Sequence, residues 1–225
     1  MAMISNSVAL AFATLLYSLP AALAVPDVTV SALPAGCSSY PGYDADTGVA
    51  GPWVLQTVST DNTAIEGFSD TSVYSVAFST KPELRWGSIT FPNDNKYAKT
   101  PLQCQSDVLN ARVPTDLTAA GAPTDYQWTP LVLSPYPYDA ELMWKVNGDE
   151  VKIFEHYING TKQDGVFLGG YDASTTWGFK YYPADQGSSG LDYFLIRLLG
   201  PDSADPTTGA ALQANETTGF IKIYA

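Results

Sequence analysis

Hydrophobic and polar positions alternate along most of the chain in short runs, and helical periodicity is almost absent. The runs are rich in Val, Ile, Tyr, Phe, Trp and Thr, and clusters of Gly, Pro, Asn and Asp separate them, which is typical of antiparallel β-structure. The sequence therefore predicts an all-β fold. The expected strands are Val28–Ser31, Trp53–Val58, Ser72–Phe78, Leu84–Phe91, Val108–Val113, Tyr126–Leu133, Glu141–Val146, Glu150–Ile158, Val166–Gly169, Thr175–Tyr182, Asp192–Leu199 and Gly219–Tyr224.

Two Asn-Gly pairs mark predicted hairpin turns, because both residue types tolerate the positive φ angles that a type I′ turn requires. Asn147-Gly148 separates "ELMWKV" from "DEVKIFEHYI" and predicts a hairpin between these two strands. Asn159-Gly160 has the same turn chemistry and would form an exposed tip. The stretch from Pro201 to Gly219 is too polar and too rich in Pro and Gly for a central strand. We expect it to be a long surface loop that leads into a terminal strand and covers one mouth of the fold.

The domain organisation is simple. No internal repeat and no long linker interrupts residues 25–225, and about 200 residues are enough to bury a full core. We expect one antiparallel β-sandwich or barrel of the jelly-roll kind.

The first residues have the features of a signal peptide. An apolar run from Val8 to Tyr17 is followed by Pro20 and by the small-x-small sequence Ala22-Leu23-Ala24, although no Lys or Arg precedes the run. Residues 1–24 are therefore interpreted as a leader, and no later segment is apolar for long enough to predict a membrane span. The sequence predicts a protein of the secretory pathway, either secreted or retained in a vesicular lumen.

The charge and the cysteines narrow the choice of partners. The net charge of −12 repels phosphate backbones and anionic membranes, so nucleic acid is not an expected partner. Cys37 and Cys104 are the only cysteines, and in an oxidising compartment they predict one disulfide. With one histidine and two thiols, no ordinary zinc site can be formed. The sequons at Asn159 and Asn215 predict N-glycosylation at solvent-facing positions.

His156, the only histidine, lies in the predicted strand "VKIFEHYI". Alternation places it on one strand face with Phe154 and Ile158, and both faces are mixed in polarity. It is either an ordinary near-surface residue of a glycosylated hairpin or a base beside a pocket. The sequence contains no Gly-x-Ser-x-Gly elbow and no glycine-rich phosphate loop, so it predicts neither a serine hydrolase nor a nucleotide-dependent enzyme. Acidic pairs such as Asp139 and Glu141 are interpreted as solvated side chains.

The five Trp and 14 Tyr residues either pack in the core or line a pocket for a flat apolar or sugar ligand. In "TTWGFKYYP", Trp177 and Tyr181 share one strand face and Lys180 lies on the other. Arg197 stands in the apolar run "YFLIRLLG". A cation in such a strand either forms a structural salt bridge or binds an acidic or enolate ligand inside a cavity.

The leader, the cysteine pair, the sequons and the segments "RWGSITFP", "TTWGFKYYP" and "YFLIRLLG" together resemble small secreted fungal β-proteins, and among these the hetero-Diels-Alderases of tropolonic sesquiterpenoid biosynthesis. The resemblance implies a glycosylated enzyme that joins a tropolone or polyketide quinone methide to a humulene-type sesquiterpene without a cofactor or a metal. Its partner would be an apolar small molecule held in an aromatic cavity. Chosen by residue type and strand position, the candidate catalytic residues are His156, Lys180 and Arg197, and the candidate substrate-binding residues are Tyr126, Trp128, Trp177 and Tyr181.

Two other classes of function fit the same composition. A non-catalytic module would stack exposed Trp and Tyr on sugar rings of a cell wall or host glycan, and it would present a planar aromatic strip instead of an enclosed cavity. A secreted structural or effector glycoprotein would hold all its aromatic side chains in the core.

Overall fold

Strands make up 52% of the protein and helix only 4%, which confirms the all-β prediction. The computed structural model describes residues 24–69, 72–77, 85–92, 99–118, 123–135, 140–186 and 190–225, so the predicted leader, except its last residue, and Asp139 lie outside the described residues. The elements are β1 (Thr29–Ala32), η1 (Cys37–Ser39), β2 (Tyr43–Asp44), β3 (Val49–Val58), β4 (Ser72–Ala77), β5 (Arg85–Pro92), β6 (Leu102–Gln105), β7 (Val108–Leu117), β8 (Pro123–Leu133), β9 (Ala140–Trp144), β10 (Asp149–Glu150), β11 (Lys152–Ile158), β12 (Thr161–Lys162), β13 (Phe167–Gly169), η3 (Tyr171–Ala173), β14 (Thr176–Tyr182), β15 (Tyr193–Leu198) and β16 (Glu216–Tyr224).

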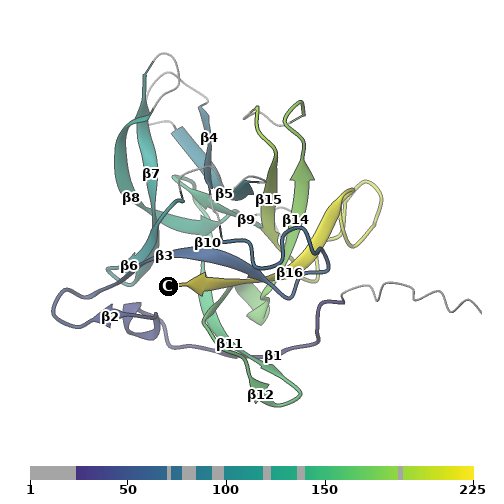
Figure 1. Ribbon diagram of the computed structural model, residues 1–225, viewed down its shortest axis with the longest axis horizontal. Coiled ribbons are helices and arrows are strands. Elements are labelled where there is room, and N and C mark those ends of the chain that lie inside the picture. The colour runs from purple at the N-terminus through teal and green to yellow at the C-terminus, as the bar shows by residue number, and fades with distance from the viewer. Residues whose placement is uncertain are drawn as a thin grey trace, which may run out of the picture.

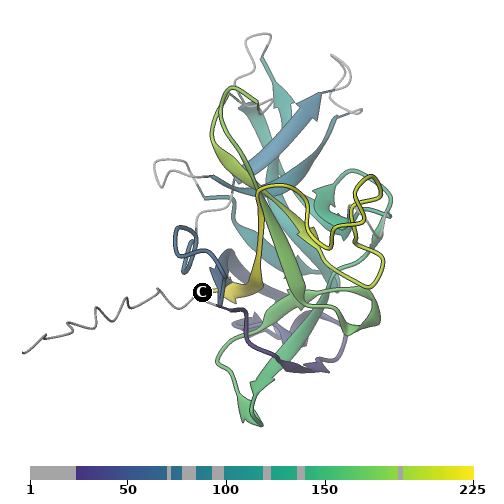
Figure 2. The ribbon, with the colours of Figure 1, turned by 90° about the vertical axis from the view of Figure 1, so that its right-hand side faces the viewer.

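Nine of the strands form a closed antiparallel barrel, in the order β3, β16, β14, β15, β5, β9, β8, β7 and β6, with β6 returning to β3. Strand β16 closes the ring, because it pairs with β14 from Glu216 to Phe220 and with β3 from Phe220 to Tyr224 (Figure 1). Strands β13, β11 and β1 extend the sheet from β16 beyond the barrel, in the lower part of Figure 2.

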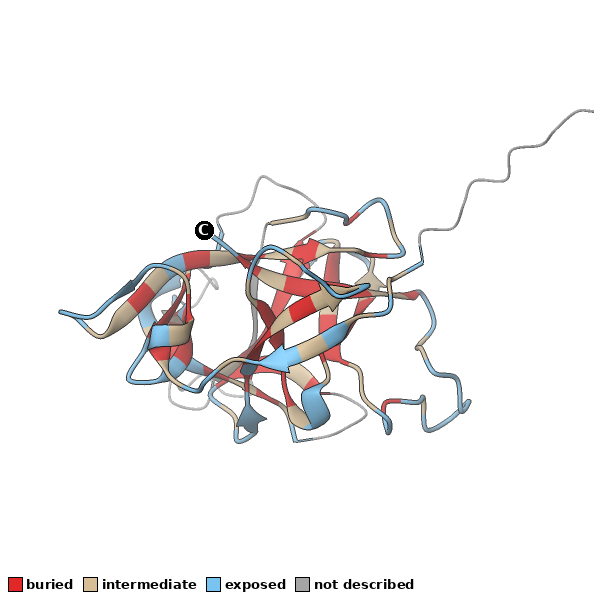
Figure 3. Cartoon of the chain, turned by 90° about the horizontal axis from the view of Figure 1, so that it is seen from below, coloured by how far each residue is buried: buried red, intermediate tan, exposed pale blue. Residues whose placement is uncertain are grey.

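The barrel core is filled by alternate residues of its strands. Trp177 and Phe179 of β14 belong to the same buried cluster as Phe91 of β5, and the Phe91 and Phe179 rings lie 6.1 Å apart in an edge-to-face contact. Buried positions form bands along the strands when the protein is seen from below (Figure 3). This alternation matches the period of two that the sequence pattern predicts.

Each of the twelve predicted strands has a counterpart in the structure, and the sequence pattern missed only short ones such as β6 and β12. The prediction for the long loop is correct in its extent, since β16 begins at Glu216. Within the loop, the carbonyl oxygen of Ser203 accepts a hydrogen bond from Arg197 of β15, and the backbone amide of Gln213 donates to Glu216 of β16. Cover of one mouth of the barrel by this loop stays a prediction.

The predicted hairpin at Asn147-Gly148 is wrong. Strand β9 pairs with β8 and β5, whereas β10 pairs with β8, and neither Asn147 nor Gly148 has a positive φ. Gly148 is needed for a different reason, because a Cβ atom there would lie 2.0 Å from the carbonyl oxygen of Leu133. The second predicted turn, at Asn159-Gly160, is confirmed: it is a type I′ turn with φ angles of 50° and 76° between β11 and β12.

The predicted disulfide between Cys37 and Cys104 is present and joins η1 to β6 across 67 residues of sequence. Both sulfur-bearing residues are buried. Asp107, in the turn after β6, also accepts a hydrogen bond from the Cys37 amide at 3.2 Å. The disulfide therefore fastens the N-terminal segment to the barrel wall, and it fits an extracellular or secretory protein. In the described part of the chain, no helix has the length and apolarity needed to cross a membrane.

We expect the double substitution Cys37→Ala/Cys104→Ala to destabilise the fold by about 4 kcal/mol, because opening a loop of this length raises the chain entropy of the unfolded state. Urea unfolding of the variant and of the oxidised wild type measures the difference. Reduced wild-type protein should match the variant, and equal midpoints for oxidised wild type and variant would contradict the expectation.

Candidate functional site: a cavity at His156

His156 is buried, with 1% of its surface exposed, which corrects the interpretation of this residue as a near-surface hairpin position. Its strand β11 lies between β1 and β13 in the sheet. One face of β11 meets the main core, and the other face points away from it. Val151, just before β11, and Ile153 point into the main core, whereas Phe154 and His156 point away from it. The imidazole is therefore buried on the outer side of the sheet, by side chains that do not belong to the main core.

Two phenylalanine rings fix the orientation of the imidazole. The ring of Phe167 on β13 stacks on it in parallel, with centroids 3.7 Å apart and an interplanar angle of 6°. The ring of Phe220 on β16 meets it edge-on at 4.6 Å and 83°. Phe220 stands where β16 pairs with both β14 and β3, so the closure of the barrel positions one wall of the site.

His156 lines a cavity of about 230 Å³, and its Nε2 atom is buried without a hydrogen-bond partner among the described residues. Buried polar atoms without partners cost about 1–3 kcal/mol, so each one in a native fold calls for an explanation. A ligand with a complementary polar group would supply the missing hydrogen bond. The other lining residues are Val28, Val58, Ser59, Ile158, Gln163, Asp164, Phe167, Phe220 and Lys222.

Burial lowers the pKa of His156 from 6.5 to about 4, because the positively charged form loses its hydration. The side chain is therefore neutral at pH 7, with one ring nitrogen as a donor and the other as an acceptor. A neutral imidazole beside the rings of Phe167 and Phe220 can exchange a proton or a hydrogen bond with a hydroxyl or a carbonyl group of a ligand. It would not hold an anion by charge.

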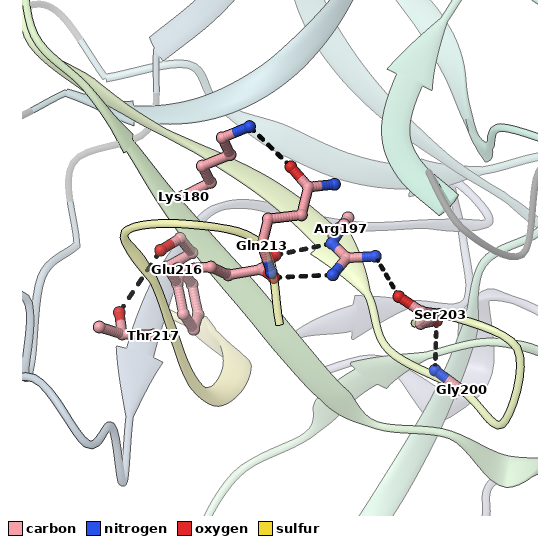
Figure 4. Close-up of polar contacts among 8 residues, drawn as sticks. Lys180, Arg197, Gly200, Ser203, Gln213, Glu216 and Thr217 are labelled. Carbon is pink, nitrogen blue, oxygen red and sulfur yellow. Dashed lines mark hydrogen bonds and ion pairs between the residues drawn. The ribbon is translucent and has the colours of Figure 1, made fainter. Parts of the chain in front are cut away.

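Arg197 and Lys180, the other two candidate catalytic residues, lie together but away from this cavity (Figure 4). Arg197 is 3% exposed and forms a bidentate ion pair with Glu216, with distances of 2.7 Å from Nε to Oε1 and from Nη2 to Oε2. A third guanidinium nitrogen, Nη1, donates to the carbonyl oxygen of Ser203 at 2.9 Å. Lys180 donates to the side chain of Gln213 at 2.7 Å.

These contacts favour the structural interpretation of both cations. Gln213 and Ser203 belong to the long loop, and the amide of Gln213 also donates to Glu216 at 2.8 Å. Gly178 gives the carboxylate its space, since a Cβ atom there would lie 2.2 Å from Glu216 Oε1. Arg197 and Lys180 thus hold the loop against the outer wall of the barrel.

The four aromatic residues predicted to bind substrate occupy three different places, and none lines the His156 cavity. Trp177 is fully buried in the barrel core, where its Nε1 donates to the carbonyl oxygen of Leu168 at 3.0 Å. Tyr181 is half-buried, with its ring centroid 5.3 Å from that of Phe194. Tyr126 is 50% exposed and Trp128 half-buried. Strand alternation places this last pair on the face opposite the buried side chains of β8.

Both sequon asparagines are exposed, as the sequence predicts. Asn159 has a φ of 50° in the β11–β12 turn, and Asn215 has a φ of 60° directly before β16. Attachment of a glycan at either position stays a prediction.

Sequence reasoning missed the residues that build the cavity around His156. Phe167 and Phe220 lie on other strands than His156. They reach it only because β13 pairs with β11 on one side and with β16 on the other. No sequence signal identified these residues, because the sequence does not specify that β13 lies beside β11, where Phe167 pairs with Phe154.

No cluster of three or more His, Cys, Asp or Glu side chains that could hold a metal ion is found within the described ranges. Comparison of the chain with protein-family models and with curated proteins finds no match.

Replacement of His156 by Phe should raise the stability at pH 7 by about 1 kcal/mol, because it removes the unpaired nitrogen and keeps an aromatic ring on Phe167. The advantage should grow as the pH falls from about 6.5 to about 4. In that range the unfolded wild-type chain takes up a proton on His156 that the folded state resists, so the wild type loses stability. Urea titrations of both proteins across this range measure the gap. A gap that stays constant with pH would show that the folded imidazole titrates normally.

Replacement of Arg197 by Met should destabilise the fold by about 3–5 kcal/mol, because it leaves the carboxylate of Glu216 buried without its partner. The double variant Arg197→Met/Glu216→Leu should recover most of this loss, since no charge remains buried. Lys180→Met serves as the control and should cost less than about 1 kcal/mol. Equal losses in the single and double variants, measured by urea unfolding, would contradict a buried ion pair.

Proposed function

We propose that this protein is a secreted, cofactor-independent pericyclase, a hetero-Diels-Alderase, whose reaction takes place at the His156 cavity. The substrates would be a tropolone or polyketide precursor of a quinone methide and a humulene-type sesquiterpene of fungal secondary metabolism. The resemblance of the sequence to such enzymes suggests the reaction class. The observation that carries the proposal is the buried, unpaired Nε2 of His156, a residue that lines a cavity of mixed polar and apolar side chains.

The neutral imidazole suits the first step, which is the loss of water from a hydroxymethyl precursor. The ring hydroxyl of the precursor gives its proton to His156, the C–O bond to the departing hydroxyl breaks, and His156 passes the same proton to this oxygen, which leaves as water. The ring hydroxyl becomes a carbonyl, and the product is a neutral quinone methide. No oxidant or reductant takes part. Because burial keeps His156 uncharged, it is in the state needed to accept the proton at pH 7.

The second step forms one C–C and one C–O bond between the quinone methide and an alkene. It depends on the relative orientation of the two reactants more than on acid–base catalysis by the protein. Restricting two reactants to a reactive geometry can supply several kcal/mol of barrier reduction. A cavity of about 230 Å³ lies below the usual range of about 300–1,000 Å³ for ligand pockets, so it suits the ring of one reactant. The alkene would extend beyond this cavity, and Val28, Val58 and Ile158 are the aliphatic side chains of the lining that it could contact.

Secretion is part of this proposal and rests on three features. The predicted leader, the disulfide and the two exposed sequons all suit passage through an oxidising compartment. Neither Asn159 nor Asn215 is among the residues that line the cavity.

A second candidate function is carbohydrate binding, and the pair Tyr126 and Trp128 favours it. They lie two residues apart on one face of β8, outside the barrel wall, and present aromatic surface to solvent. Two such rings could stack on successive sugars of a glycan. The two functions use separate residues, so a pair of substitutions distinguishes them.

Purified mature protein should accelerate formation of the adduct between a hydroxymethyl tropolone and a humulene-type alkene, and should enrich one stereoisomer. The His156→Phe variant should lose about 100-fold or more in rate, because it keeps the ring but has no proton acceptor. Chiral chromatography with mass detection measures both rate and isomer ratio. Trp128→Ala is the matched control and should retain wild-type activity.

The outcomes separate the candidates. A rate and isomer ratio equal to those without protein would overturn the proposal, and full activity of His156→Phe would remove His156 from the mechanism. Binding of oligosaccharides that Trp128→Ala abolishes and His156→Phe leaves intact would establish the carbohydrate-binding function.

A further inference from the structure

A second cavity lies on the opposite side of β11 from His156 and plays no part in the proposed reaction. It has a volume of about 210 Å³ and is formed between the segment after β1, the start of β7, and the region of β10 and β11. Its walls are mainly aliphatic. They come from Ala32, Leu33, Pro34, Ala35, Val108, Leu109, Leu131, Val151 and Ile153.

The cavity has a fixed frame. The disulfide anchors Cys37 directly after the segment that forms one wall, and the Leu33 amide donates to the carbonyl oxygen of Ile153 at 2.9 Å. Val108 is 40% exposed at the cavity, an unusual exposure for a large aliphatic side chain beside a disulfide-bound frame. An apolar ligand segment would cover this surface without rearranging the backbone.

The polar side-chain groups of the lining are two carboxylates, one phenol and the ammonium group of Lys152. Tyr40 lines the cavity and stacks on Trp53, with ring centroids 5.4 Å apart. Burial, and then the negative charge of Glu150, raise the pKa of Tyr40 above its usual range, so this phenol stays protonated and lies within the electrostatic reach of Glu150. Asp107 supplies a second carboxylate.

One basic residue, the exposed Lys152, also belongs to the lining. It offsets one of the two carboxylates, Asp107 and Glu150, so the lining keeps a net negative charge. The whole protein adds a net charge of −12. The local and the overall field therefore both attract a cation and repel an anion.

We propose that this cavity binds an amphipathic cation, in which an apolar chain or ring system ends in an ammonium group. The apolar part fills the space against Leu33, Val108 and Ile153. The ammonium group lies at the rim between the carboxylate of Glu150 and the ring of Tyr40, whose face favours positive charge. This site does not depend on the function proposed for His156.

Three eight-carbon probes test the assignment by isothermal titration calorimetry: octylammonium, 1-octanol and octanoate. Octylammonium should bind most tightly, octanol more weakly and octanoate least. The affinity for octylammonium should fall as salt is added, because screening weakens the attraction between the ammonium group and the carboxylate of Glu150. Glu150→Gln should weaken octylammonium binding about fivefold, as expected for a solvent-accessible ion pair, and leave octanol unchanged.

Asp149→Asn is the matched control, because it removes the same charge from the neighbouring residue of β10, which does not line the cavity. It should bind octylammonium as the wild type does, and so should His156→Phe. Equal losses in Glu150→Gln and Asp149→Asn, or equal affinities for octylammonium and octanol, would overturn the recognition of a cation. Absence of binding by all three probes would overturn the site itself.

Discussion

Strand β16 pairs with β3 along one edge and with β14, then β13, along the other, and this double pairing closes the barrel. The change of partner takes place between Phe220, which faces Thr176 of β14, and Lys222, which faces Phe167 of β13. The sheet therefore forks at this point. One branch completes the barrel, and the other curves outward through β13 and β11 to β1. The His156 cavity lies at this fork, on the face of β16 that points away from the core.

Two buried polar side chains, Glu216 of β16 itself and His156 of β11, lie at the outward face of β16 and meet the cost of burial in opposite ways. Glu216, at the start of β16, is satisfied by the guanidinium of Arg197 and the amide of Gln213. His156, next to Phe220 near the other end, has an unpaired nitrogen and loses its charge instead. The first arrangement is complete without a ligand and holds a loop in place. The second is incomplete, and for this reason it is the better candidate for recognition of a small molecule.

Sequence pattern was sufficient for properties that depend on neighbouring residues. Alternation located the strands and placed Trp177 and Phe179 on one face, and the cysteine count was enough to predict the disulfide. It was insufficient where the answer depends on which strands are adjacent. Asn147-Gly148 and Asn159-Gly160 have the same turn chemistry, yet only the second forms a type I′ turn. The first does not connect two paired strands, because β10 pairs with β8 and not with β9. The burial of His156 follows in the same way from pairings with Val30 and from the contact with Phe220, which are remote in sequence.

The position of β16 in the chain also determines the order in which the protein can be assembled. The cysteines at positions 37 and 104 leave the ribosome long before β16 does, so the disulfide that anchors the N-terminal segment can form on an open sheet. Barrel closure and the wall that Phe220 contributes must wait until β16 has been synthesised. An incomplete chain thus exposes strand edges on β3 and β14, which are sites for pairing with other chains. The folding compartment has to protect these two edges until synthesis has passed Tyr224.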